Sequence, residues 1–208
     1  LLTCDLPPDQ ITRAKLIYDL MRTELMSGQY LDLLEQVRGG ITQDRAEVVI
    51  RYKSAKYTIE RPLHMGAVIA GADAKLLAAL SRYGLALGEA FQLRDDLLGV
   101  FGNAEVTGKP AGDDLREGKQ TMLIAHATSS ASESDRKFLL AHLGSASIAE
   151  ATIAKLQTIL IECGSQDFIE ERIAAGLAAA MSALSEITDQ ESNSALAALA
   201  ILATNRTA

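Results

Sequence analysis

Two adjacent carboxylates, Asp95 and Asp96, stand in an otherwise apolar segment of this 208-residue chain. At about 100° per residue they share one helical stripe with Gln92 and Gly99, called the acidic stripe below. Adjacent carboxylates on an apolar helix cost free energy unless a cation or a basic partner lies opposite them. Two lysines ten residues apart follow in a glycine-rich stretch. This pattern indicates a site for metal-bound phosphate.

The two lysines, Lys109 and Lys119, are expected to lie on a flexible loop that faces the acidic stripe. Spacing alone leaves a plainer alternative open. The acid pair is equally typical of an exposed helix end capped by water, with Gly84 and Gly88 serving only to let helices pack closely.

Two more polar clusters interrupt apolar helical patterns. Gln29 and Asp32 lie one turn apart, and Lys53, Ser54 and Lys56 precede a predicted helix break at which a pocket can open. Each cluster, taken alone, is also typical of a solvated surface.

A nucleotide phosphate loop is excluded, although Gly102 and Gly108-Lys109 bear a superficial likeness to one. Five residues instead of four separate the glycines, Pro110 stands where a magnesium-binding hydroxyl belongs, and the preceding element is predicted to be a helix rather than a strand.

The histidines and cysteines show no spacing typical of a metal site or a nucleophile. His64, His126 and His142 are therefore predicted to be packing or surface residues. Cys4 and Cys163 are far apart in sequence, which indicates neither a disulfide framework nor a zinc site and favours a reducing, cytoplasmic setting.

The elements that must position these groups are predicted to be helices. Hydrophobic residues make up 48% of the chain, proline occurs only four times, and alanine and leucine are abundant. We expect one all-α domain over residues 1–208, with a break near Thr58–Pro62 and a loop over Gly102–Gly118. The expected helices are Asp9–Val37, Thr42–Ala70, Asp73–Phe101, Gln120–Ser129, Glu133–His142, Ser147–Glu162, Ser165–Thr188 and Glu191–Thr204.

Charge and hydropathy exclude several partners. A formal charge of -7 without clustered basic residues argues against nucleic acid. No apolar run approaches the roughly 18 residues that a transmembrane helix needs. Because the chain begins with Leu, we expect it to lie inside a longer polypeptide.

Four segments of the chain resemble, in the same order, motifs of the trans-isoprenyl diphosphate synthases, which are also called polyprenyl synthetases. Residues 91–99 are similar to their second aspartate-rich motif, FQxxDDxxD, residues 28–33 to their GQxxDL segment, and residues 53–57 to their KTAxY segment. Residues 107–109 and 114–119 are similar to the loop that follows the aspartate-rich motif. The chain would then be the C-terminal two-thirds of a longer synthase of the geranylgeranyl or farnesyl type.

The resemblance implies an antiparallel helical bundle around a deep central cavity, usually in a homodimer. It also implies a magnesium-dependent prenyltransferase that condenses an allylic diphosphate with isopentenyl diphosphate, with geranylgeranyl-type products favoured. Asp95 would bind Mg²⁺ and Asp96 would support it, which agrees with the preference of this ion for oxygen ligands. The residues expected to bind substrate or assist the reaction are Gln29, Asp32, Lys53, Ser54, Gln92, Lys109 and Lys119.

The sequence departs from the family pattern in two places. Gly99 replaces the last aspartate of the motif, and no first aspartate-rich motif occurs, since the other acid pair, Asp113-Asp114, falls in the predicted loop. A terpene cyclase or a non-catalytic synthase subunit of the same fold therefore remains an alternative. A helical interaction domain is an alternative from a different functional class.

Overall fold

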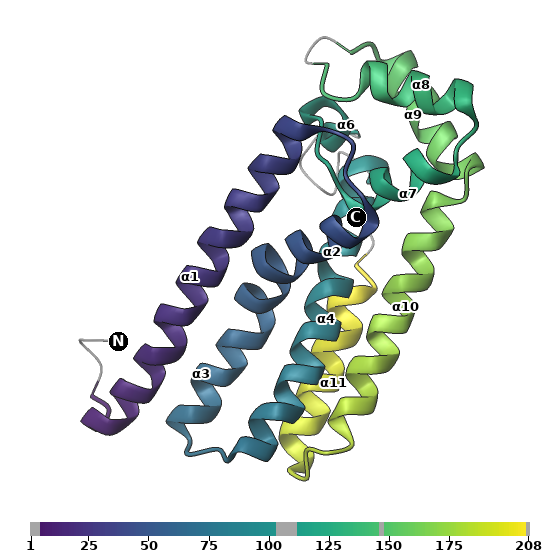
Figure 1. Cartoon of the computed structure of the whole chain (residues 1–208). Helices are drawn as coiled ribbons and strands as arrows, with labels where there is room; N and C mark the ends of the chain where they lie inside the picture. The colour runs from purple at the N-terminus through teal and green to yellow at the C-terminus, as the bar shows by residue number, and fades with distance from the viewer. Residues whose placement is uncertain (1–4, 103–111, 146–147, 207–208) are drawn as a thin grey trace.

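The computed structural model describes residues 5–102, 112–145 and 148–206, and these parts of the chain contain helices and no strand. Long helices run side by side along most of the molecule, and shorter helices gather at one end (Figure 1). The α-helices are α1 (Pro8–Arg38), α2 (Gln43–Ile50), α3 (Arg61–Ile69), α4 (Ala74–Phe101), α6 (Asp113–Glu117), α7 (Met122–Ser130), α8 (Glu133–His142), α9 (Glu150–Glu162), α10 (Ser165–Leu184) and α11 (Gln190–Thr204), and a π-helix, η1 (Arg51–Glu60), joins α2 to α3. This arrangement confirms the predicted all-α class.

Local capping signals explain where several helices begin. The side chains of Thr42, Asp73 and Thr121 accept hydrogen bonds from the backbone amides three residues ahead, at the starts of α2, α4 and α7. The prediction of Thr42 as an N-cap is thus confirmed. The helix predicted over Ser165–Thr188 was too long, because α10 ends at Leu184.

The predicted break near Thr58–Pro62 was wrong in kind, although a change of helix type does fall there, since η1 ends at Glu60 and α3 begins at Arg61. The chain stays helical from α2 to α3, but it widens into η1, which begins at Arg51. The amide of Arg61 donates to the carbonyl of Lys56, five residues back, and Pro62 lies in the first turn of α3. A wider turn accommodates the proline ring, and the first turn of a helix tolerates its missing N–H.

A short helix also lies inside the stretch that was predicted to be a loop. Gly112 and Gly118, with φ of 76° and 72°, flank α6, and Asp113 and Asp114 lie in its first turn. Glycine adopts such left-handed backbone conformations without strain, so these glycines delimit a helix here instead of preventing one.

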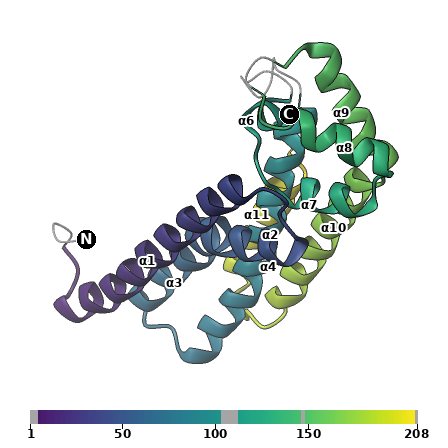
Figure 2. The same ribbon diagram turned by 45° about the horizontal axis from the view of Figure 1, so that its top comes forward.

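The central helix is α4, which packs most extensively against α10 and η1. It buries apolar side chains along its whole length, including Tyr83, Leu87, Leu93 and Val100. These side chains contribute to two hydrophobic clusters, one with α10 and α11, and the other with α7, α9 and α10. Figure 2 shows that α6, α7, α8 and α9 surround the end of the bundle at which α4 terminates.

Glycines let η1 approach its neighbours on both sides. A Cβ on Gly28 of α1 would lie 2.3 Å from the amide nitrogen of Lys53, and one on Gly88 of α4 would lie 2.5 Å from the Cα of Ala55. Gly84 likewise contacts the backbone of Glu60. The expectation that Gly84 and Gly88 permit close packing is confirmed, and the polar segments of α1, η1 and α4 are brought together.

Within the described ranges, no helix combines the length and the apolar character needed to cross a bilayer.

Candidate active site

The acidic stripe occupies the last turns of α4, where its two carboxylates meet different surroundings. Asp96 is buried, with 6% of its surface exposed, and it accepts a hydrogen bond of 2.9 Å from Nε2 of Gln92. Burial raises the pKa of Asp96 to about 7, and the nearby charges of Asp114 and Asp95 act in the same direction. The alternative of a water-capped, exposed acid pair is therefore wrong for Asp96.

Asp95 lies at the surface and forms an ion pair with the segment that follows α11. Its Oδ1 lies 2.9 Å from Nη1 of Arg206, and 37% of its side chain is exposed. Consecutive helical residues point about 100° apart, so one carboxylate faces inward and the other remains accessible.

A third carboxylate, that of Asp114, lies directly over the stripe and was not among the predicted site residues. A Cβ built on Gly99 would be 2.1 Å from Oδ2 of Asp114, so the missing side chain leaves room for this carboxylate. Asp114 is buried, and its other oxygen accepts a hydrogen bond from Lys119. The signal in the sequence was the glycine at a motif position that normally holds an acid.

Lys119 lies close to this group of carboxylates, as its predicted role requires. Its ammonium contacts Asp114 and lies 3.1 Å from Glu117. Burial alone would lower the pKa of Lys119, but the hydrogen bonds and charges of Asp114 and Glu117 raise it above the ordinary value. Lys109, Gly108 and Thr107, the other residues of the predicted loop motif, lie outside the described residues.

The second polar cluster joins α1 to η1. Nζ of Lys53 lies 2.6 Å from Oδ2 of Asp32, although the two residues are 21 positions apart in sequence. Ser54 is buried, and its neighbour Ala55 contacts Gly88, which lies one turn before Gln92 on α4. Gln29, in contrast, is exposed on α1. The structure thus places Lys53 and Ser54 on η1, which packs against α4, whereas Asp32 lies on α1, which packs against η1.

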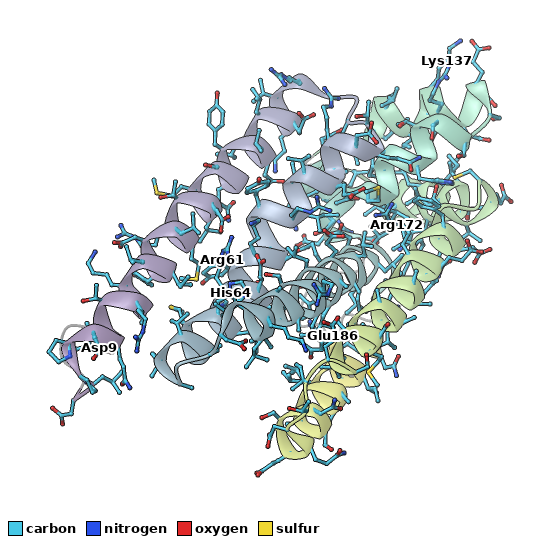
Figure 3. The ribbon with its side chains drawn as sticks, turned by 60° about the horizontal axis from the view of Figure 1, so that its bottom comes forward. Asp9, Arg61, His64, Lys137, Arg172 and Glu186 are labelled. Carbon is cyan, nitrogen blue, oxygen red and sulfur yellow. The ribbon has the colours of Figure 1, made fainter. Side chains whose placement is uncertain are left out.

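Lys56 belongs to a separate ion network between α1, η1 and α3. Glu24 accepts hydrogen bonds of 2.7 Å from both Lys56 and Nε of Arg61, and Glu60 lies 3.7 Å from each cation. Nδ1 of His64 lies 3.2 Å from Arg61, and Figure 3 shows these two side chains together. Balanced charges and burial indicate a structural role for Lys56.

The histidines behave as predicted. His64 is buried, and burial together with the charge of Arg61 lowers its pKa despite the opposing charge of Glu60. His126 stacks on Phe168 and His142 stacks on Phe138.

The donor set fits a hard divalent cation only if other oxygen ligands complete the coordination. Among the described residues, no three Asp, Glu, His or Cys side chains converge closely enough to hold an ion. Mg²⁺ typically binds one or two protein carboxylates, keeps several waters and takes its remaining ligands from phosphate oxygens. Asp95 and Asp96 fit that chemistry, and the ammonium of Lys119 lies close by.

Comparison with known proteins identifies relatives over most of the chain. The family model described as polyprenyl synthetase matches residues 7–160. The short chain isoprenyl diphosphate synthase of Methanothermobacter thermautotrophicus is 32% identical over 177 residues, which cover 85% of this chain and 54% of that protein. The geranylgeranyl diphosphate synthase of Methanosarcina mazei is 36% identical over 149 residues, or 71% of this chain and 44% of that protein.

Solved structures agree with the fold. The geranylgeranyl pyrophosphate synthase of Corynebacterium glutamicum, in complex with isoprenyl diphosphate and magnesium, matches with a TM-score of 0.92 and 39% identity over 97% of this chain and 57% of that one. A polyprenyl synthase of Caulobacter crescentus, in complex with calcium and isoprenyl diphosphate, matches with a TM-score of 0.85 and 31% identity over 94% of this chain and 59% of that one. The chain spans about half the length of the curated relatives it matches.

Proposed function

Because this chain belongs to the polyprenyl synthetase family, we propose that it forms a single helical domain of a magnesium-dependent prenyltransferase. The reaction would condense an allylic diphosphate with isopentenyl diphosphate to give a longer all-trans isoprenyl diphosphate. One observation carries the proposal: at the end of α4 the buried Asp96, the accessible Asp95 and the Asp114–Lys119 pair over Gly99 form one polar group.

In this proposal the carboxylates of α4 hold the metal. Asp95 would be the direct ligand, and Asp96, oriented by Gln92, would act directly or through water once it has lost its proton. Asp114 would supply the negative charge that Gly99 lacks. Bound Mg²⁺ would neutralise the charge that develops on the departing diphosphate.

The basic residues would bind the diphosphate oxygens. Lysine suits this role because it is a mobile point charge with three donors. Lys119 and Lys109 would approach from the loop side and Lys53 from η1, where Asp32 holds its ammonium. Ser54, Gln92 and the exposed Gln29 would line the polar shoulder of the central cavity that the family resemblance implies.

The reaction needs no side-chain nucleophile. The carbon–oxygen bond of the allylic diphosphate breaks, the π electrons of isopentenyl diphosphate form the new carbon–carbon bond, and loss of one proton restores a double bond. The surrounding helices would exclude water, which would otherwise quench the allylic cation. Relatives named geranylgeranyl diphosphate synthases support a product of that length.

We also propose that the enzyme is a cytoplasmic homodimer that pairs through α1. This helix presents a run of exposed apolar side chains for which the described chain offers no cover: Leu16, Leu20, Met26, Tyr30, Leu33 and Val37. Exposed apolar surface of this extent is typical of an interface.

Magnesium-dependent stabilisation by inorganic pyrophosphate tests the proposed site. We expect thermal unfolding to shift upward only when Mg²⁺ and pyrophosphate are both present, because each supplies part of the coordination. Asp95→Ala should abolish the shift without unfolding α4, since alanine is the better helix former. Asp9→Ala is the matched control, because Asp9 is an exposed helical aspartate paired with Arg13 at the far end of α1 (Figure 3).

An unchanged shift in Asp95→Ala, or no shift in the unmodified chain, would contradict the site. The reaction product distinguishes a prenyl synthase from a terpene cyclase. Incubation with allylic and isopentenyl diphosphates should yield a chain-elongated diphosphate, whereas a cyclic hydrocarbon would indicate a terpene cyclase.

A further inference from the structure

The segment that follows α11 returns to the acidic end of α4. Arg206 forms the ion pair of 2.9 Å with Asp95, and its guanidinium lies 5.0 Å from the centre of the Phe91 ring, one turn earlier on α4. A cation over an aromatic face gains a second, weaker attraction. Arg206 is therefore held by two side chains of the motif that carries the proposed metal ligands.

The end of α11 is anchored so that Arg206 can reach this position. Nε of Arg94 donates a hydrogen bond of 2.8 Å to the carbonyl of Thr204, two residues before Arg206. Both terminal nitrogens of Arg94 also donate to Glu170 of α10, at 2.7 Å each. This bidentate pair ties α4, α10 and the end of α11 together.

The guanidinium of Arg206 lies on Oδ1 of Asp95, one of the two oxygens through which this carboxylate could bind a divalent ion. Arginine offers only donors and keeps its charge at all accessible pH values, so it satisfies the carboxylate without adding a metal ligand. The pair is also weak enough to exchange, because 45% of the Arg206 side chain and 37% of the Asp95 side chain are exposed. A divalent ion carries twice the charge of the guanidinium and would compete with it for this carboxylate.

We propose that Arg206 is a competing cation that holds Asp95 in the metal-free chain and leaves it when a divalent ion binds. The segment Asn205–Arg206 then acts as a latch whose release accompanies metal binding. This inference rests on the proposed function, because it takes Asp95 to be a metal ligand.

Metal affinity tests the latch directly. Binding of Mn²⁺ in the presence of inorganic pyrophosphate would be measured by electron paramagnetic resonance of the free ion. Arg206→Gln should bind Mn²⁺ about two- to fivefold more tightly, which is the range expected for an exposed ion pair. An equal or weaker affinity would overturn the inference, and a weaker one would indicate that Arg206 binds the diphosphate.

Arg82→Gln is the matched control for loss of one positive charge. Arg82 lies on α4 and forms an ion pair with Glu186. The exposed fractions of these two side chains, 52% and 39%, are similar to those of Arg206 and Asp95. Arg82 lies 13 residues before Asp95, or about 20 Å along the helix axis. Arg82→Gln should leave Mn²⁺ affinity unchanged. If it increased the affinity as much as Arg206→Gln does, the effect of Arg206 would be one of overall charge, and the latch would be wrong.

Amide hydrogen exchange of residues 202–206 would follow release of the latch without a measurement of metal affinity. Exchange should increase when Mg²⁺ and pyrophosphate bind to the unmodified chain, and Asp95→Asn should show the same increase without ligand. Unchanged exchange in both cases would overturn the inference.

Different outcomes would contradict the latch and the proposed function. If the unmodified chain and Arg206→Gln bind Mn²⁺ equally well, the proposed function stands and the latch is wrong. If neither binds, both are wrong. If only Arg206→Gln binds, the latch is supported in a form that blocks the site completely.

Discussion

The carboxylate of Asp114 occupies the space that a side chain on Gly99 would fill, since a Cβ at this glycine would lie 2.1 Å from Asp114 Oδ2. The motif position that lacks an acid is thereby covered by an acid from α6, with Lys119 as its counter-charge. The glycine therefore changes which element supplies negative charge to this end of α4.

Gly99→Ala should displace Asp114 and weaken metal binding at the proposed site. A carboxylate cannot remain 2.1 Å from a carbon atom, so Asp114 must move and take its contact with Lys119 along. Loss of a supporting residue typically costs about tenfold or more in metal affinity, which calorimetry with Mg²⁺ and pyrophosphate would measure. Gly66→Ala in α3 is the control, because no atom lies within 4 Å of its added Cβ. That variant should gain roughly 0.5–1 kcal/mol in free energy of unfolding.

Asp96→Asn should remove a pH-dependent destabilisation. The pKa of Asp96 rises from 3.8 to about 7 on folding, so the folded chain binds more protons than the unfolded chain between these values. The free energy of unfolding should therefore fall as pH rises from about 4 to 7, by about 1.4 kcal/mol for each pKa unit as an upper limit. Asparagine does not titrate, so its stability advantage should grow across that window and level off above it.

Urea unfolding at pH 4.5, 6 and 8 in metal-free buffer would measure this difference. Parallel stability profiles of the two proteins would show that Asp96 does not titrate in this range.

Gly28→Ala should destabilise the contact between α1 and η1. Its Cβ would meet the backbone of Tyr52 and Lys53, which cannot rotate away as a flexible side chain would. Overpacking of this kind costs about 1–3 kcal/mol or more, and the shift should separate Lys53 from Asp32. The urea midpoint of Ser27→Ala should stay close to that of the unmodified chain, because Ser27 is exposed and its hydroxyl donates to the carbonyl of Thr23 in its own helix. A midpoint for Gly28→Ala that matches this control would contradict the close contact.

Arg94→Ala should loosen the end of α11. The substitution removes two charge-assisted bonds to Glu170 and the donor to Thr204, and we expect a loss of about 1–2 kcal/mol because Glu170 is partly exposed. Amide exchange should accelerate near Thr204, whereas Arg82→Ala should not change it. Unchanged protection at Thr204 would show that hydrophobic contacts alone hold α11.

Local patterns in the sequence were sufficient to predict the all-α class and most helix positions. Helical periodicity and capping depend on residues a few positions apart, so α1, α4 and α8 were anticipated closely. The same short-range spacing placed Asp95 and Asp96 near the end of one helix. The widening into η1 was not foreseen, because it accompanies close contacts with Gly28 and Gly88 from two other helices.

Only the tertiary structure decided what each polar group contacts. Burial of Asp96 beside an accessible Asp95, the carboxylate of Asp114 over Gly99, and the pairing of Arg206 with Asp95 all depend on helices from distant parts of the chain. The type and spacing of the residues therefore determined which chemistry the chain carries. Helix packing determined that Asp96 is desolvated and that Asp95 lies near the surface in an ion pair with Arg206, since burial and charge proximity are properties of three-dimensional neighbours.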